Sequence, residues 1–145
     1  MRRATAYRRN GRILLDTLSR TTAGVWIGCG PVMVINTGED TALLGRAVLE
    51  ALNHSEENVP HPQRESWARI LYPLLNAAGV TTWNTFAKSA LCVGIGFSTN
   101  MVSFVPKKNL GPKNGFDALQ EKTRNSPPTD IEIGSALLAA FEDAE

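Results

Sequence analysis

Two nine-residue segments of similar sequence, 44–52 and 133–141, constrain the fold most strongly. The first reads LGRAVLEAL and the second IGSALLAAF, and each follows a region whose apolar residues predict paired β-strands. In both segments a glycine and small or branched apolar residues recur at helical spacing, which is typical of a helix pressed closely onto a sheet. The repetition predicts an α+β fold built from two related halves, each with strands followed by a helix.

The length and charge of the chain limit the classes of protein to consider. With 145 residues, we expect one domain, 1–145, with one core. The 15 Lys and Arg residues nearly balance the 14 Asp and Glu residues, and the formal net charge of +1 argues against an obligate nucleic-acid binder. No apolar run approaches the ~18 residues of a membrane-spanning helix. No apolar secretory segment follows the arginines at positions 2, 3, 8 and 9, so we expect a cytoplasmic protein.

The first strands are predicted from a turn signal and a broken apolar run. Asn10-Gly11 separates 4–8 from 13–18, and Asn-Gly supplies the positive φ angles that a tight hairpin needs. Apolar runs at 25–29 and 32–35 flank Gly30-Pro31, which predicts either a bulge or bend, or a second hairpin. Cys29 and Cys92 lie within apolar runs, so we expect small buried thiols that stay unpaired in a reducing compartment.

Three to four helices are predicted to pack on a mainly antiparallel sheet of hairpins. A helix capped by Asp40 or Thr41 runs to about residue 53, and a last helix begins after Thr129 or Asp130. An amphipathic stretch at 67–78 contains Pro73, which is expected to kink or split the helix near residues 69–72. A short helix is predicted from Thr81 or Thr82 to Lys88.

The remaining strands lie between the third and the last helix. In 91–97, bulky residues alternate with Cys92, Gly94 and Gly96, and this bare face indicates close packing of backbone. A strand at 101–105 is predicted to stop at Pro106. The segment 107–128 has few apolar anchors and is predicted to be a long surface loop.

Catalytic, cofactor and metal motifs are not recognisable. His54 and His61 share one proline-rich loop without a carboxylate partner, and the scattered Cys and His residues have no zinc-type spacing. Gly94-Ile95-Gly96 lacks the third glycine of a dinucleotide-binding turn. We therefore predict no catalytic residue, cofactor or metal. An enzyme built from scattered residues such as His61, Glu65 and Asp117 has no spacing in its favour.

Basic residues provide the candidate binding surface. Lys107, Lys108, Asn109, Lys113 and Asn114 form a segment that can grip phosphates or an acidic protein surface, or simply be solvated. The arginines of the first hairpin can extend this surface, although edge strands also carry such charges to avoid pairing with other chains. A nucleic-acid-binding or regulatory module using the basic hairpin and this segment is the alternative function. The three tryptophans, at positions 26, 67 and 83, are predicted core aromatics, and any exposed one becomes an interface candidate.

Ordered blocks from residue 21 to residue 145 carry a family resemblance. These blocks are TTAGVWIG at 21–28, GRAVLEAL at 45–52, VPHP at 59–62, AAGVTTWNTFAKSALCVGI at 77–95, FVPKKNLGPKNGF at 104–116 and IGSALLAAF at 133–141. With them, the chain resembles the immunity proteins of bacterial contact-dependent growth inhibition systems. The resemblance implies a cytoplasmic, non-catalytic protein that forms a one-to-one complex with the C-terminal toxin domain of a delivered surface protein and neutralises it, usually by covering a nuclease active site.

The resemblance provides no motif for the binding residues, so these rest on the sequence alone. Many nuclease inhibitors are strongly acidic, whereas this chain has a net charge of +1. A mixed interface is therefore expected, in which Lys107, Lys108 and Lys113 meet acidic residues of the toxin or flank its cleft, with Asn109 and Asn114 beside them. The partner is a protein, with no direct contact to nucleic acid, membrane or small-molecule substrate expected.

Overall fold

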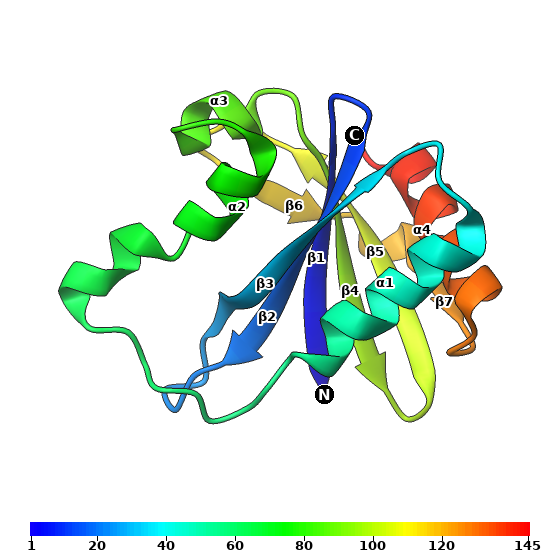
Figure 1. The fold of residues 1–145 in the computed structure, drawn as a ribbon, viewed down its shortest axis with the longest axis horizontal. Coiled ribbons are helices and arrows are strands. Elements are labelled where there is room, and N and C mark those ends of the chain that lie inside the picture. Colours follow the sequence, from blue (N-terminus) through cyan, green and yellow to red (C-terminus); the bar gives the residue numbers. More distant parts are fainter.

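A seven-stranded antiparallel sheet organises the computed structural model, which describes residues 1–145 (Figure 1). The strands are β1 (Arg2–Arg9), β2 (Arg12–Arg20), β3 (Trp26–Asn36), β4 (Leu91–Ser98), β5 (Met101–Asn109), β6 (Phe116–Ala118) and β7 (Arg124–Ser126). The helices are α1 (Thr41–Asn53), α2 (Tyr72–Ala78), α3 (Trp83–Ala87) and α4 (Asp130–Asp143), with 3-10 turns η1 (Arg64–Arg69) and η2 (Gln120–Lys122). The strand order is β3-β2-β1-β4-β5-β6, and β7 also pairs with β5.

The strand order confirms the prediction of two related halves. β1, β2 and β3 precede α1, and β4 to β7 precede α4. The halves meet at the centre of the sheet, where β1 pairs antiparallel with β4. Each half starts with a hairpin whose two turn residues have positive φ, Asn10 and Gly11 in the first and Thr99 and Asn100 in the second. The predicted Asn-Gly hairpin is thus confirmed, because two such residues match the twist of paired strands.

The Gly30-Pro31 break produces a bulge, not a second hairpin. β3 is one continuous strand along β2, and its register shifts between Asp16 and Leu18. Gly30 has a φ of 125°, which favours glycine because other residues rarely adopt it. The bulge turns Cys29 outward, so the predicted burial of this thiol is wrong, whereas Cys92 is buried as predicted.

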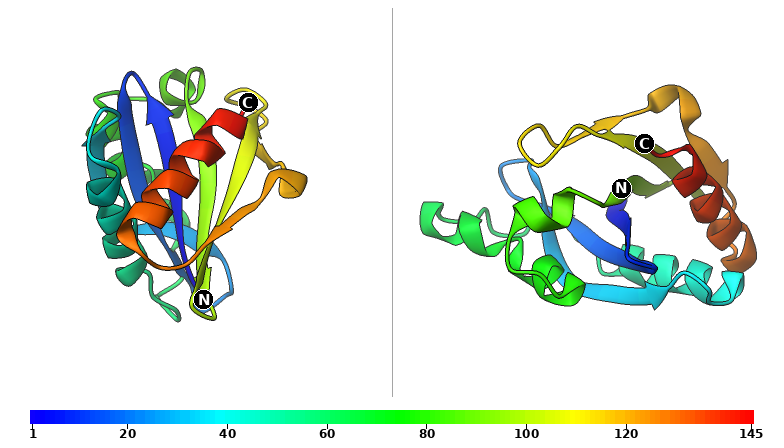
Figure 2. Two further views of the ribbon diagram at one scale, coloured as in Figure 1. Left: turned by 90° about the vertical axis from the view of Figure 1, so that its right-hand side faces the viewer. Right: turned by 90° about the horizontal axis from the view of Figure 1, so that it is seen from above.

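One face of the sheet and the two long helices enclose the main core. It contains 17 buried residues, with Ala4, Ile13, Val93 and Phe104 from the strands and Leu137 from α4 among them. α1 and α4 lie side by side on this face (Figure 2). Because side chains alternate along a strand, the neighbouring residues of β1, β2, β4 and β5 point to the opposite face.

The repeated glycines lie where the two helices cross. A methyl group on Gly45 would overlap the carbonyl group of Asp130, and one on Gly134 would overlap that of Thr41. Each carbonyl belongs to the residue four positions before the other glycine, so the contact is reciprocal, as in a two-fold interface. The predicted packing of both helices on the sheet is confirmed by the main core, but the glycines themselves contact the other helix and not the sheet. They allow α1 and α4 to touch each other through their backbones.

α2 and α3 cover one end of the opposite face. A second core there contains Leu14, Leu74, Leu75, Phe86 and Ala90, with Tyr7 packed edge-on against Phe86. The predicted helix over 67–78 is split, as Pro73 required: a 3-10 turn ends at Arg69, and the proline occupies the first turn of α2. The short helix is confirmed, with the Thr82 side chain capping α3.

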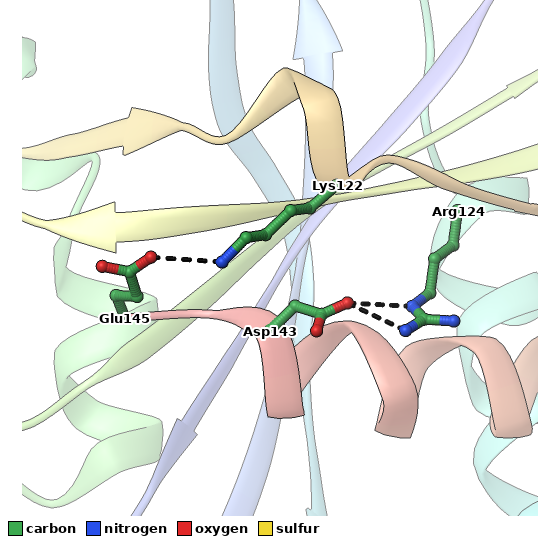
Figure 3. Close-up of polar contacts among 4 residues, drawn as sticks. All are labelled: Lys122, Arg124, Asp143 and Glu145. Atoms are coloured by element: carbon green, nitrogen blue, oxygen red, sulfur yellow. Dashed lines mark hydrogen bonds and ion pairs between the residues drawn. The ribbon is translucent and has the colours of Figure 1, made fainter.

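The segment 107–128 is not the long loop that the sequence predicted. β5 continues through Pro106 to Asn109. Pro106 has no amide hydrogen to donate, but its carbonyl accepts a hydrogen bond from the Leu119 amide, so the proline does not end the strand. β6, η2 and β7 follow. Figure 3 shows how this segment contacts the end of α4: the Arg124 guanidinium donates two hydrogen bonds to Asp143, and the Lys122 ammonium lies 3.3 Å from the Glu145 carboxylate.

Candidate functional site

The face of the sheet opposite α1 and α4 is left open beyond the second core. There β1, β4 and β5 form the floor of a cavity of about 250 Å³. Its polar lining comes from Arg3, Thr5, Ser103, Lys107 and Gln120. We call it the open-face cavity. Its side chains come from both halves of the chain, so the central β1–β4 pairing positions the site.

The bare face of β4 is what leaves room for this cavity. A methyl group on Gly94 would lie 3.3 Å from Lys107 Cε, and one on Gly96 would lie 3.1 Å from Ser103 Oγ. These nearest atoms belong to flexible side chains, so the prediction that the two glycines serve close backbone packing is wrong. Because the two glycines have no side chains, this part of β4 leaves space for the side chains of β1 and β5.

Two positively charged side chains, Arg3 and Lys107, line the open-face cavity. Arg3 packs its guanidinium over the Trp26 ring, 4.8 Å from the centroid, and its Nε contacts the Met1 sulfur at 3.4 Å. Lys107 reaches the cavity from β5 and makes no ion pair within the chain. Guanidinium and ammonium groups beside hydroxyl and amide groups bind carboxylates or phosphates. The cavity is thus suited to receive an acidic side chain.

The five residues predicted from sequence do not share one surface. Lys107 lines the open-face cavity, whereas Lys108, next along β5, points to the other side and is exposed. The Asn109 amide donates to the carbonyls of Ala87 and Ala90 at 2.6 and 3.0 Å, so it holds β5 against the end of α3. Lys113 and Asn114 are exposed in the turn before β6.

The remaining members of the cavity were missed by sequence reasoning. Arg3, Thr5 and Ser103 occupy alternate strand positions that face away from the main core. These residues could have been identified from the sequence, because side chains alternate between the two faces along β1 and β5. Gln120 carried no such signal, because its place depends on the chain turning back at β6.

The basic hairpin is dispersed rather than gathered into a patch. The Arg2 guanidinium donates to the Asn53 side chain at the end of α1, and Arg9 donates to Ser89. Arg8 lies 3.6 Å from Glu142 of α4. Strand alternation divides the four arginines between the two faces of the sheet, with Arg2 and Arg3 at one end of β1 and Arg8 and Arg9 at the other. A continuous track for a phosphate backbone is therefore not formed by this hairpin.

The scattered residues of the enzyme alternative are not brought together. His61 Nδ1 hydrogen-bonds with the Thr21 hydroxyl at 3.0 Å, and its ring contacts Trp67. Glu65 is in η1, beyond the β3 edge, whereas Asp117 is in β6 at the other edge of the sheet. No group of three or more His, Cys, Asp and Glu side chains is arranged to hold a metal ion. No helix has the length and apolar character needed to cross a bilayer.

Burial raises the pKa of the two weak acids beside the second core. The pKa of the Cys92 thiol is raised to about 12 by burial, which the positive charge of Lys107 partly opposes. Tyr7 also has a pKa well above its usual value, again mainly because of burial, with smaller contributions from Cys92 and Asp16. Both groups are therefore uncharged near neutral pH and behave as core residues.

Asp16 is the unusual acid of this face. Its carboxylate lies over Gly28, where a methyl group would approach its oxygen to 3.0 Å, and burial raises the pKa of this carboxyl to about 6. An aspartate in an unfolded chain has a pKa of about 3.9, so the ionised form destabilises the folded chain by about 3 kcal/mol at neutral pH.

Asp16→Asn is therefore expected to stabilise the protein at pH 7.5 by about 1 to 3 kcal/mol. A raised carboxyl pKa means that stability increases as the pH falls through 6 toward 4, because the folded chain takes up the proton first. The variant lacks this increase, so its advantage should disappear near pH 4. Urea unfolding of both proteins at pH 4 and 7.5 measures the difference, and an equal difference at the two pH values would contradict the assignment.

Comparison with solved structures finds the same fold in two other proteins. A protein of unknown function, NMB0488, from Neisseria meningitidis is similar with a TM-score of 0.82 and 18% sequence identity, over 99% of this chain and 95% of that chain. A chain of the CdiA-CT/CdiI toxin and immunity complex from Yersinia pseudotuberculosis is similar with a TM-score of 0.77 and 17% identity, over 99% of this chain and 97% of that chain.

Sequence comparison gives no further relative: no protein-family model and no curated protein matches the chain. At 17 and 18% identity, the structural likeness establishes the shared architecture and leaves binding residues to be argued from this chain itself. The chain therefore has the complete fold of NMB0488 and of a chain of the CdiA-CT/CdiI complex, which agrees with the family that its sequence resembles.

Proposed function

We propose that this chain is an immunity protein of a contact-dependent growth inhibition system. It binds the C-terminal toxin domain of a cognate effector in the cytoplasm, without catalysis, and neutralises it. The observation that carries the proposal is the likeness, over 99% of the chain, to a chain from a toxin and immunity complex. The family resemblance of the ordered sequence blocks supports it independently.

The toxin domain is a nuclease in this proposal, and the immunity protein covers its active site in a one-to-one complex. The open-face cavity supports this reading, because Arg3 and Lys107 offer cations to a partner while the chain as a whole is nearly neutral. Metal-dependent and general-base nucleases use carboxylates at their active sites, and such groups are complementary to these cations. Lys113 and Asn114 extend the contact along the turn before β6, and Asn109 supports that turn from β5, whereas Lys108 points to the other face of the sheet and lies outside the contact.

A specific interface of standard size buries about 1,600 Å² in total. The open-face cavity alone is too small for such an area, so neighbouring surfaces of β5, β6 and the second core join it. Simultaneous charge reversal of Lys107 and Lys113 is expected to weaken toxin binding at least about 100-fold, since two favourable charge pairs become repulsive. Isothermal titration calorimetry measures the change, and unchanged affinity would remove these lysines from the interface.

The proposal is tested with the toxin domain encoded at the end of the large gene immediately upstream. Co-expression is expected to restore growth of cells that produce this domain, and light scattering of the purified mixture should give one copy of each chain. Nucleic-acid cleavage by the toxin domain should fall to zero at a molar ratio of one. Absence of a complex at 10 µM protein, or growth arrest despite co-expression, would refute the proposal.

A direct measurement on the free chain separates this function from the nucleic-acid-binding alternative. Fluorescence anisotropy with labelled RNA and DNA at 50 and 200 mM salt is expected to show no saturable binding, because the hairpin arginines are dispersed. Saturable binding that weakens steeply between these salt concentrations would favour the regulatory module instead.

A further inference from the structure

A second cavity, distinct from the open-face cavity, lies between the β3 bulge and the η1–α2 segment. Its volume is about 240 Å³, and Asp16, Gly28, Cys29, Arg69, Ile70 and Pro73 are among its lining residues. We call it the Asp16 cavity. It combines a sheet floor, at β2 and β3, with a wall from a segment that projects away from the sheet, at the left edge of Figure 1.

The carboxylate at the base of this cavity has no partner within the chain. None of the five ion pairs of the structure includes Asp16, and no side-chain hydrogen bond reaches it. Arg69 lines the same cavity but is not paired with it. A partly buried carboxylate without a partner is unfavourable in the free protein. A cation brought by another molecule would remove that cost and gain a charge-assisted hydrogen bond.

Apolar side chains are exposed along the same projecting segment. Trp67, Leu71 and Tyr72 keep 40, 38 and 53% of their surface accessible, and Ile70 lines the cavity itself. The sequence places the apolar residues of 67–78 on one face interrupted by Pro73. Leu74 and Leu75 of α2 are buried in the second core and Ala77 and Ala78 pack against it, whereas the three exposed residues lie before the proline. Exposed aromatic residues beside a charged cavity are typical of the centre of a protein interface.

We propose that the Asp16 cavity receives an arginine or lysine side chain of the toxin domain, whose neighbouring apolar residues cover Trp67, Leu71 and Tyr72. This inference rests on the proposed function and adds the location of a second contact. The interface then has opposite charges at two places, with cations of this chain in the open-face cavity and an anion in the Asp16 cavity. Such an arrangement fixes one orientation of the partner and rejects toxins with another charge pattern.

The cavity is first tested without the toxin, by nuclear magnetic resonance with two small probes. N-acetyl-arginine amide is cationic, and N-acetyl-citrulline amide is a neutral probe of nearly the same shape. The arginine probe is expected to shift the amide signals of Gly28, Cys29 and Gly30 saturably, and to bind at least about tenfold more tightly than the citrulline probe. Asp16→Asn should abolish this preference, whereas equal binding of both probes, or of both proteins, would overturn the inference.

The pH dependence provides a second readout. Tyr7 of β1, Cys29 of β3 and Arg69 of η1 are the titratable or charged groups that face Asp16. The pKa of Tyr7 is raised well above its usual value by burial, so this group stays uncharged between pH 5 and 7.5. Because the Asp16 carboxyl has a pKa of about 6, arginine-probe binding is expected to weaken about tenfold from pH 7.5 to pH 5. Binding that is independent of pH would contradict the role of this carboxylate.

The toxin domain then tests the contact itself. Asp16→Asn is expected to weaken toxin binding at least tenfold while the variant remains folded and more stable, so loss of structure cannot account for the loss of affinity. Unchanged toxin affinity of this variant would overturn the inference and leave the proposed function intact. Failure of the wild-type chain to bind the toxin would instead refute the proposed function, and the two small probes still decide whether the cavity accepts a cation.

Discussion

Gly134→Ala is expected to lower the free energy of unfolding by at least about 3 kcal/mol, or to prevent folding at 37 °C. The added methyl group would overlap the Thr41 carbonyl, and a backbone atom in a packed helix cannot move aside as the end of a side chain can. This expected loss of stability is opposite to the usual effect, because alanine in place of glycine normally stabilises a helix by about 1 kcal/mol. Urea unfolding followed by circular dichroism measures the change.

Ser135→Ala is the matched control for this substitution. Ser135 follows Gly134 in α4 and is exposed, so alanine there should change stability by less than about 0.5 kcal/mol. Gly45→Ala is expected to resemble Gly134→Ala, because the Asp130 carbonyl blocks its methyl group in the same way. The double variant should lose less than the sum of the two, since helices separated by one methyl group already make room for the other. Additive losses would show that the two contacts are independent.

Lys107→Glu is expected to weaken toxin binding at least about 100-fold, the largest effect of any single substitution on the open face. Lys107 contributes to the open-face cavity from its β5 side and has no ion pair within the chain, so its charge is free to attract a partner. Reversal creates a repulsive contact with any acidic group seated there. Surface plasmon resonance with the immobilised toxin domain separates the association and dissociation rates, and both are expected to change.

Arg46→Glu is the control for Lys107→Glu, because it changes the net charge by the same amount. Arg46 is exposed on α1, on the helix-covered side of the sheet, and its ion pair with Asp130 is a surface contact worth less than about 1 kcal/mol. Its variant should keep toxin affinity within about threefold. Equal losses for the two variants would mean that toxin binding responds to overall charge and not to the open-face cavity.

The local elements of this fold could be predicted from the sequence because each has a local signal. Asn10-Gly11 specifies the first hairpin, Thr82 the cap of α3, and the repeated apolar stripe the two long helices. The predictions fail where the structure of a residue depends on contacts with a segment distant in sequence. Pro106 continues β5 because its missing amide hydrogen is not needed by either neighbouring strand, and Gly45 and Gly134 serve a helix crossing that only the complete fold creates.

The candidate sites follow the same rule. Lys107 could be selected from the sequence because it lies in a cluster of basic residues, but its separation from Lys108 follows from strand alternation in β5, and Lys113 lies beyond β5 in the turn before β6. Arg3 and Gly96 stand opposite each other only because β1 pairs with β4. Asp16 gave no signal, since its burial results from the β3 bulge and from the segment at 64–73 that covers it.

The central position of β1 also bears on how the chain is made in the cell. Arg8 pairs with Leu91 and Arg2 with Phe97, so the first strand to leave the ribosome lacks one neighbour until more than half of the chain has been translated. At about 5 to 20 residues per second, this delay lasts several seconds, during which β1 can pair with β2 but its β4 side stays unpaired. A nascent chain therefore lacks the open-face cavity until β4, β5 and Gln120 have been translated, whereas every residue that lines the Asp16 cavity has been translated by Pro73.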